Sequence, residues 1–438
     1  MNISAKTAEL LVACVALTAA SARAQDSAGR PSHADSALAL RALRAAPIID
    51  GHNDLPWRVR EDSAHPRDVD GYDLRHRTPG MTDLDRLKRG MVGAQFWSVY
   101  TPGERDDSAY APNGSVASVP GYARVQLEQI DIARRMIARY PDRLVWATSS
   151  ADIRRSFRTG KVASLLGIEG GHAIENSLGA LRAYYGLGVR YMTLTHNVTL
   201  DWADAALDSA RHGGLTLFGK EVVREMNRLG MLVDLAHVSP GTMSDALTAS
   251  EAPVIFSHSG ARALVDHRRN VPDSILRRVT ANGGIVMVPF VTSFVSRAVF
   301  TDDSAYAHVA QEARQRYPTD SAARSRVLAE WRTAHPKPVA TISDVADHIE
   351  HVRQVAGIDH VGIGSDFDGI TDTVVGLSDV SMFPAVFFEL ARRGWSEADL
   401  RKLAAENLLR VMSQAESVSA RLRRERPASL ATIKQLDR

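Results

Sequence analysis

Short apolar runs rich in Val, Ile and Leu alternate along the chain with longer amphipathic stretches. The eight apolar runs occupy residues 46–50, 93–100, 162–169, 189–196, 231–237, 253–258, 283–290 and 360–366. Helical periodicity fills most of the intervals, as at 121–140 and at 219–230, where Gly230 stands at the position of a helix C-cap. Near-continuous apolar strands separated by helices predict a parallel sheet that is covered on both faces. Eight such units predict a closed (β/α)8 barrel of the TIM type.

The alternation is interrupted once and is absent near both ends of the chain. Residues 295–341, between the seventh and eighth strands, are polar and charged with helical stretches. They are expected to form a helical insertion, either as an elaborated barrel helix or as a lid over the active-site mouth. Residues 25–36 are small and polar, which is typical of a disordered leader. A single barrel domain is therefore expected at 37–415, followed by a charged tail at 416–438.

Residues 1–24 have the layout of a secretory signal peptide. Lys6 precedes the apolar stretch LLVACVALTAA, and Ala22 and Ala24 form an A-x-A motif that predicts cleavage after Ala24. The apolar stretch is too short for a permanent membrane span. A lipoprotein anchor at Cys14 is the less favoured alternative, because Glu9 leaves little apolar sequence before the cysteine. We therefore expect an exported protein, periplasmic or secreted, that loses its only cysteine with the signal.

The charge of the chain argues against one class of function. Its 53 basic and 51 acidic residues give a formal net charge of +2, and no basic run is interleaved with aromatic residues. Nucleic acid is therefore not an expected partner. The hydrophobic content of 45% is an ordinary globular value that allows a large core.

Six of the eight predicted strands end in side chains that can bind a metal ion or transfer a proton. In a (β/α)8 barrel the carboxyl ends of all strands meet at one end, where active sites lie. His52 and Asp54 stand two residues apart and so point to the same side of the first strand. The strand-end residues are His52, Asp54, Glu169, His196, His237, His258 and Asp366.

Each of these residues alone has an ordinary explanation, but their occurrence at six strand ends together indicates a functional site. A single His is often a packing residue, Glu169 could face a helix N-terminus, and Asp366 or Asp368 could shape a turn. Imidazole and carboxylate without thiolate suit a catalytic zinc site. Their number fits two metal ions about 3.5–4 Å apart that share a carboxylate and a water.

At these residues the sequence resembles the membrane (renal) dipeptidase family of zinc peptidases, family M19, over about residues 46–412. The matching segments, which follow one another in order, are IIDGHNDLPW, QFWSVYTP, LLGIEGGHAIE, RYMTLTHN, NRLGMLVDLAHVS, PVIFSHSGAR, RRNVPD, VGIGSDFDG and ENLLRVM. Several are long and correctly placed, so the resemblance is far more specific than one short motif.

The resemblance implies two zinc ions per chain. His52 and Asp54 would bind the first ion, and His237 and His258 would bind the second. Glu169 would bridge the two ions together with a water or hydroxide.

The resemblance also implies how a dipeptide would be bound and cleaved. His196 would contact the carbonyl oxygen of the substrate and stabilise the oxyanion, and Arg269 would bind the C-terminal carboxylate. Asp366 would accept a proton from the bridging water and pass it to the leaving amine. The adjacent Arg268 is the alternative candidate for binding this carboxylate, and its ordinary explanation is that of a surface charge. The implied activity is dipeptide hydrolysis by attack of a metal-bridging hydroxide, including dipeptides with a C-terminal D-residue.

The chain departs from the family pattern in three ways. It lacks the cysteines and the hydrophobic C-terminal signal of members with a glycosylphosphatidylinositol anchor, so a homodimer would form without a disulfide. Phe294 stands where such enzymes can offer a tyrosine near the substrate, so the side-chain preference can differ. His172 is near the cluster but out of register for a ligand, and we expect it to support a ligand or to be structural.

Two other functions stay open at this point. One keeps the fold and the metals but hydrolyses another amide, a lactone or a phosphoester. The other is an exported binding module without catalysis, which would be expected to lack metal ligands, whereas all five are present here.

Overall fold

The computed structural model describes residues 31–103 and 121–437. The predicted signal peptide, its cleavage site and Cys14 lie outside these residues. No helix within the described ranges combines the length and the apolar character that a membrane crossing requires.

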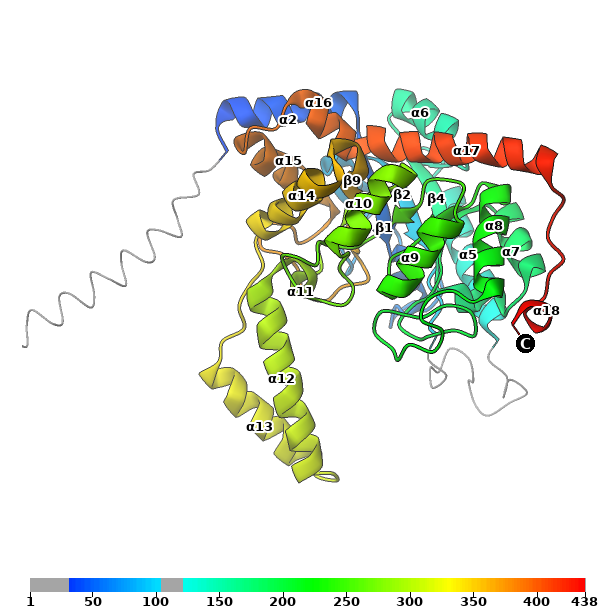
Figure 1. Ribbon diagram of the computed structural model, residues 1–438. Helices are drawn as coiled ribbons and strands as arrows, with labels where there is room; N and C mark the ends of the chain where they lie inside the picture. The colour runs from blue at the N-terminus through cyan, green and yellow to red at the C-terminus, as the bar shows by residue number, and fades with distance from the viewer. Residues whose placement is uncertain (1–30, 104–120, 438) are drawn as a thin grey trace, which may run out of the picture.

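Eight parallel strands close into a barrel at the centre of the molecule (Figure 1). The sheet runs β2-β1-β9-β8-β7-β6-β5-β4, and a pairing between β2 and β4 closes it. The barrel strands are β1 (Ile48–Asn53), β2 (Val92–Ser98), β4 (Val162–Glu169), β5 (Val189–Thr193), β6 (Leu232–Asp234), β7 (Ile255–Phe256), β8 (Ile285–Val288) and β9 (Val361–Ile363). Each lies within or overlaps one of the eight predicted runs, so the predicted barrel is confirmed.

One further strand, β3 (Leu144–Trp146), was not predicted. It pairs in parallel with residues 162–164 at the beginning of β4, whereas β5 pairs with residues 166–169 further along the same strand. Strand β3 therefore extends the sheet outside the closed barrel.

Helices cover the outside of the barrel and its amino end. Those that follow the barrel strands or cap its amino end are α2 (His33–Ala45), α3 (Leu55–Arg60), α4 (Leu84–Arg89), α5 (Tyr122–Arg139), α6 (Ser150–Thr159), α7 (Leu178–Gly186), α8 (Leu217–Leu229), α9 (Pro240–Ala249), α10 (Asp273–Asn282), α14 (Ile342–Ala356), α15 (Phe383–Arg392), α16 (Glu397–Arg401) and α17 (Asn407–Glu425). As the sequence predicts, α8 ends at Gly230, which has a left-handed φ of 84°.

Both ends of the described chain are more ordered than the sequence suggests. Helix α2 begins at His33 inside the expected leader, because the Ser32 hydroxyl accepts a hydrogen bond from the backbone N–H of Asp35. Helix α17 continues past the expected boundary at 415 and buries Leu422 near its end. The chain then returns to α8, where the Asp437 carboxylate accepts a hydrogen bond from the N–H of Phe218 at 3.1 Å.

The predicted insertion is helical and forms a hairpin of α12 (Arg297–Arg316) and α13 (Ser321–Ala334), joined to the barrel through α11 (Thr292–Val295). Figure 1 shows the hairpin extending away from the barrel. Tyr306 and Trp331 pack between the two helices, with ring centroids 5.7 Å apart. No residue of α12 or α13 lines the cavity at the strand ends. In this conformation the hairpin is not a lid.

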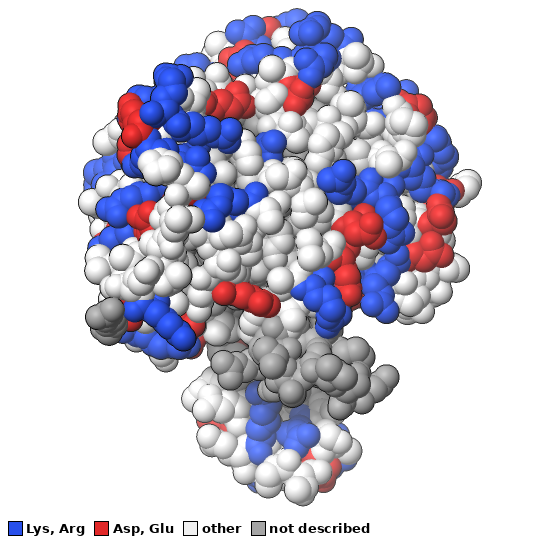
Figure 2. All heavy atoms as spheres, turned by 90° about the vertical axis from the view of Figure 1, so that its right-hand side faces the viewer, with Lys and Arg blue, Asp and Glu red and all other residues white. Residues whose placement is uncertain are grey.

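Basic side chains are frequent on the face where α7, α8 and the end of α17 meet, with acidic side chains among them (Figure 2). Several of the basic side chains in this region contact carboxylates. Arg182 and Arg228 both contact Glu225, at 3.1 and 2.8 Å, and Arg421 contacts Glu251 at 3.3 Å. These contacts neutralise part of the positive charge.

Candidate active site

A cavity of about 360 Å³ opens at the carboxyl ends of the barrel strands. It is lined by Asp54, Trp57, Tyr100, Glu169, His196, Asn197, Leu207, His237, His258, Arg269, Phe294, Asp366 and Gly369. Every residue that the sequence predicted for the site is in this lining except His52, which is fully buried and contacts Asp54 and Glu169. The structure therefore brings all eight predicted site residues together.

The glutamate at the end of β4 lies between two groups of ligand-type side chains. Its Oε2 atom is 3.6 Å from Nε2 of His52, which in turn lies 3.2 Å from Oδ2 of Asp54. The other oxygen of Glu169, Oε1, is 2.9 Å from Nε2 of His237 and 3.4 Å from Nε2 of His258. One carboxylate thus faces a His–Asp pair with one oxygen and a His–His pair with the other.

These side chains fit a divalent metal site. The buried atoms Nε2 of His52 and Oδ1 of Asp54 have no hydrogen-bond partner among the described residues. The Nε2 atoms of His237 and His258 approach to 3.0 Å. Such convergence of lone pairs is costly unless an ion or proton lies between them.

More than one set of ligands is within reach. Three groups have ligand atoms that all lie within 4.8 Å of one another: His52, Glu169 and His258; Glu169, His196 and His237; and His52, Asp54 and Asp366. The geometry alone therefore allows His196 and Asp366 as ligands too.

Hydrogen bonds on the far side of two imidazoles fix their orientation. Nδ1 of His52 lies 2.9 Å from the hydroxyl of Tyr191, and Nδ1 of His237 lies 3.1 Å from Oδ1 of Asn197. These contacts leave Nε2 of each ring facing the carboxylate of Glu169, as expected of metal-binding histidines.

The third imidazole is held by a chain that reaches back to β6. The Ser257 hydroxyl donates to the Asp234 carboxylate at 2.6 Å and lies 2.9 Å from Nδ1 of His258. Because the hydroxyl hydrogen is given to Asp234, Nδ1 of His258 must be the donor in its own bond, which leaves Nε2 unprotonated. The supporting roles of Tyr191, Ser257 and Asp234 were not predicted. In the sequence, only the position of Asp234, a carboxylate inside an apolar strand, indicates such a role.

Burial and the nearby Arg269 lower the pKa values of three of the four imidazoles in the site; the fourth, His52, has a raised pKa because Tyr191, Asp54 and Glu169 oppose the effect of burial. Both effects, burial first, lower the pKa values of His237 and His258 far below the usual range and lower that of His196 to about 3. All three imidazoles are therefore neutral at neutral pH. Burial raises the pKa of Asp366 well above that of an ordinary carboxyl group.

Asp366 is presented by a constrained turn after β9. Its φ is 65°, which is uncommon for a residue other than glycine, and its N–H donates to the carbonyl of His52 at 3.1 Å. The preceding Ser365 donates from its N–H and its hydroxyl to the buried Asp50 carboxylate, each at 2.7 Å. The turn is thereby fixed to β1, and Oδ1 of Asp366 lies 3.8 Å from Nε2 of His52.

Arg269, rather than Arg268, faces the cavity. Arg269 is 1% exposed, and its two Nη atoms have no hydrogen-bond partner among the described residues. Its guanidinium lies 5.3 Å from the ring centroid of Phe294, and burial lowers its pKa only to about 10, so it remains charged at neutral pH. Arg268 is exposed and donates to the carbonyl of Asp208 at 3.0 Å. A buried guanidinium fork without a partner is suited to a carboxylate ligand.

The aromatic side of the cavity was not predicted. The rings of Trp57 and Tyr100 meet edge to face at 4.9 Å, and Tyr100 also lies 4.9 Å from the ring of His196.

His172 lies apart from the ligand groups: Nε2 is 2.6 Å from the carbonyl of Thr101, and burial lowers its pKa to about 4. Its contacts are structural, which is one of the two roles expected for it.

The chain is similar to a known peptidase family and to several solved structures. The family model of membrane dipeptidase, peptidase family M19, matches residues 37–426. The probable dipeptidase PvdM from Pseudomonas aeruginosa superposes with a TM-score of 0.72 at 24% identity, covering 88% of this chain and 99% of that one. A metallo peptidase from Rhodobacter sphaeroides, liganded with a phosphinate mimic of L-Ala-D-Ala, gives 0.67 at 25% identity, covering 84% and 99%. The chain belongs to the membrane dipeptidase family, peptidase family M19, and is a metal-dependent peptidase of the dipeptidase type.

Proposed function

We propose that the chain hydrolyses dipeptides with a free C-terminal carboxylate, including those with a C-terminal D-residue, and that it uses two zinc ions. The observation that carries this proposal is the position of Glu169 between two ligand pairs, with the unpartnered guanidinium of Arg269 in the same cavity. The predicted signal peptide further supports export to the periplasm or the medium.

The five ligands divide between two ions. His52 and Asp54 would hold the first, His237 and His258 the second, and the two oxygens of Glu169 would join them. Two short distances support this division: Nε2 of His52 lies 3.2 Å from Asp54, and the Nε2 atoms of His237 and His258 lie 3.0 Å apart. When bound, a zinc pair supplies hydroxide near neutral pH and polarises the scissile carbonyl.

The remaining polar residues would position the substrate and move its proton. Arg269 would bind the C-terminal carboxylate in a bidentate manner. His196, which is neutral, would donate a hydrogen bond to the oxygen of the scissile carbonyl as negative charge develops there. Burial favours the protonated form of Asp366, so this carboxyl group is suited to deliver a proton to the leaving amine.

The surroundings of Arg269 support tolerance of a D-residue. The C-terminal side chain of a substrate bound there would meet Leu207 and Phe294, which line the same cavity. Leu207 is 42% exposed, so this apolar surface is open rather than a closed pocket of one handedness. The Rhodobacter sphaeroides structure was solved with a mimic of an L,D-dipeptide.

A kinetic comparison of substrates tests the proposal. Zinc-loaded protein is expected to cleave Ala-L-Ala and Ala-D-Ala and to prefer each over its C-terminal amide by about 30-fold or more, because the amide lacks the charge that Arg269 binds. N-acetylated dipeptides, lactones and phosphoesters serve as the other arms of the comparison. A preference for any of these over the free dipeptides would contradict the proposal.

Glu169→Gln is expected to weaken the binding of both metal ions together, because the amide lacks the negative charge that the two ions would share. Zinc affinity is measured for each site by competition with a chelating dye, and metal content is measured after dialysis. Glu175→Gln is the matched control, since Glu175 is exposed and lies outside the cavity. If Glu169→Gln lost one ion and retained the other at the original affinity, the bridging role would be wrong.

A further inference from the structure

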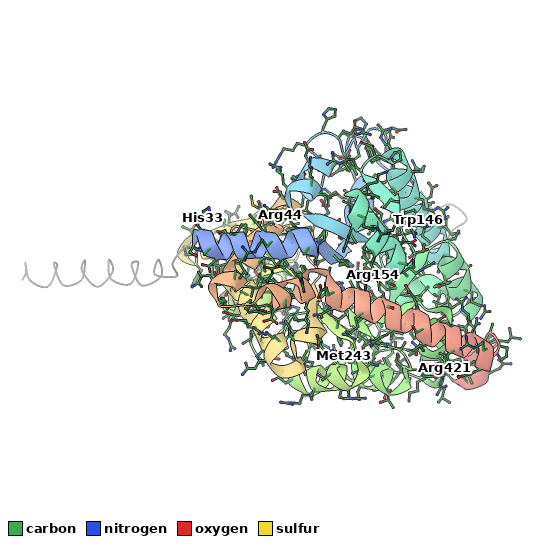
Figure 3. The ribbon with its side chains drawn as sticks, turned by 90° about the horizontal axis from the view of Figure 1, so that it is seen from above. His33, Arg44, Trp146, Arg154, Met243 and Arg421 are labelled. Atoms are coloured by element: carbon green, nitrogen blue, oxygen red, sulfur yellow. The ribbon has the colours of Figure 1, made fainter. Side chains whose placement is uncertain are left out.

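A second cavity, of about 410 Å³, lies at the end of the barrel opposite to the active site. It is formed where α2, α4 and α6 end and where β2 and β4 begin. Figure 3 views this end of the molecule, with Arg44 labelled near the end of α2 and Arg154 on α6. In (β/α)8 barrels this end normally contributes to stability rather than to catalysis.

The inner surface of this amino-end cavity is apolar. Leu43, Leu84 and Leu87 line it as buried core residues, and Met91 and Phe157 line it as partly buried ones. Its volume is within the range that small-molecule ligands occupy. An apolar lining in a cavity of this volume favours a ligand with a hydrocarbon part.

Four cationic side chains surround the apolar surface. They are Arg44, Lys88, Arg143 and Lys161, and no carboxylate is among the residues that line the cavity. The charges of Arg44 and Lys88 form no ion pair with any described residue. Arg143 donates to the carbonyl of Leu84 at 2.7 Å and lies 3.8 Å from Asp85, and Lys161 donates to the carbonyl of Pro141 at 2.7 Å.

The lining of this cavity has cations and no carboxylate, unlike that of the active-site cavity, which includes Asp54, Glu169 and Asp366. Elsewhere in the molecule, Arg182 and Arg228 both contact the carboxylate of Glu225, at 3.1 and 2.8 Å. Arg44 and Lys88 each stand in the last turn of a helix, where a cation favours the helix dipole. That effect explains each charge separately, but not their convergence on one apolar cavity that has no carboxylate in its lining.

We propose that this cavity binds a single-chain anionic amphiphile, a fatty acid of medium length. The hydrocarbon chain would lie against Leu87, Met91 and Phe157, and the carboxylate would meet Arg44 and Lys88 at the opening. The proposal is independent of the proposed peptidase function, because the two cavities share no residue.

Calorimetric titration with hexanoate, octanoate and decanoate tests the hydrocarbon part. One decanoate is expected to bind per chain, and affinity is expected to rise by about fourfold for each methylene group that becomes buried. Decanol tests the charge and is expected to bind more weakly than decanoate. If decanoate failed to saturate one site, or if hexanoate or inorganic phosphate bound as tightly, the proposal would be overturned.

A charge-reversed variant tests the location. Arg44→Glu combined with Lys88→Glu is expected to weaken decanoate binding by about tenfold or more, since two favourable pairs become repulsive. Arg424→Glu, an exposed residue in the last turn of α17 far from the cavity, is the control and is expected to bind as the unmodified chain does. Unchanged dipeptide turnover in both variants shows that they are folded. Equal decanoate affinity in the two variants would place the ligand elsewhere and contradict the proposal.

Discussion

Asp366→Asn is expected to lower kcat for dipeptide hydrolysis by about 100-fold to 10,000-fold while KM and zinc content stay close to those of the unmodified chain. Asparagine has nearly the same shape and tolerates the left-handed φ of 65° at this position. The backbone contact with His52 and the attachment of Ser365 to Asp50 also remain. Only the capacity to accept and release a proton is lost. Steady-state kinetics together with metal analysis measure the effect.

Asp368→Asn is the matched control for this substitution. Asp368 lies two residues further along, has a similar φ of 66°, and accepts a hydrogen bond from the N–H of Met81 at 2.7 Å. It does not line the cavity, so its substitution should leave kcat nearly unchanged. The geometry also allows Asp366 to act as a metal ligand beside His52 and Asp54. Loss of zinc from Asp366→Asn would show that it is a ligand and would contradict the role in proton transfer.

The barrel and the members of the site were predictable because both follow from local patterns. A buried parallel strand appears as a continuous apolar run whatever its partners are. A residue at the end of such a run lies at the carboxyl end of the barrel in any closed (β/α)8 arrangement. His52, Glu169 and His258 could therefore be placed in one cluster from their positions in the chain alone.

The features that were missed depend on which strands are neighbours and in what register. The contact of His52 with Tyr191 joins residues 139 positions apart, and that of Ser257 with Asp234 joins residues 23 positions apart. No periodicity in one segment encodes such a pair. Strand β3 was missed for another reason, since its three residues are too few for an apolar run to be recognised.

The site concentrates features that reduce stability. His237 and Asp366 have left-handed backbone conformations, Nε2 of His52 and Oδ1 of Asp54 are buried without described partners, and Arg269 is a buried cation. The unpartnered atoms and the buried cation are costly in the free protein and become favourable only when a metal ion or an anion is bound. Such a concentration of costly features is expected of a site whose ligands are held in position before the substrate arrives.

Arg269→Ala is expected to lower kcat/KM for Ala-Ala by about 30-fold to several thousand-fold, which corresponds to about 2–5 kcal/mol for loss of a buried charge contact. The same substitution should change turnover of the dipeptide amide little, because the amide has no carboxylate for the guanidinium to bind. The preference for the free acid over the amide is therefore expected to disappear. Arg269→Lys should have an intermediate effect, since it keeps the charge and loses the fork.

Thermal unfolding separates this role from a structural one. The Nη atoms of Arg269 have no hydrogen-bond partner among the described residues, so removing this desolvated cation should leave the melting temperature unchanged or raise it. Arg268→Ala is the control. The side chain of Arg268 is exposed and contacts the carbonyl of Asp208, so its loss should leave the preference for the free acid intact. If Arg269→Ala reduced turnover of the acid and the amide by the same factor, Arg269 would be shaping the cavity rather than binding the carboxylate. A selective loss of activity toward the free acid, with thermal stability retained, is the result that identifies Arg269 as the residue that binds the carboxylate.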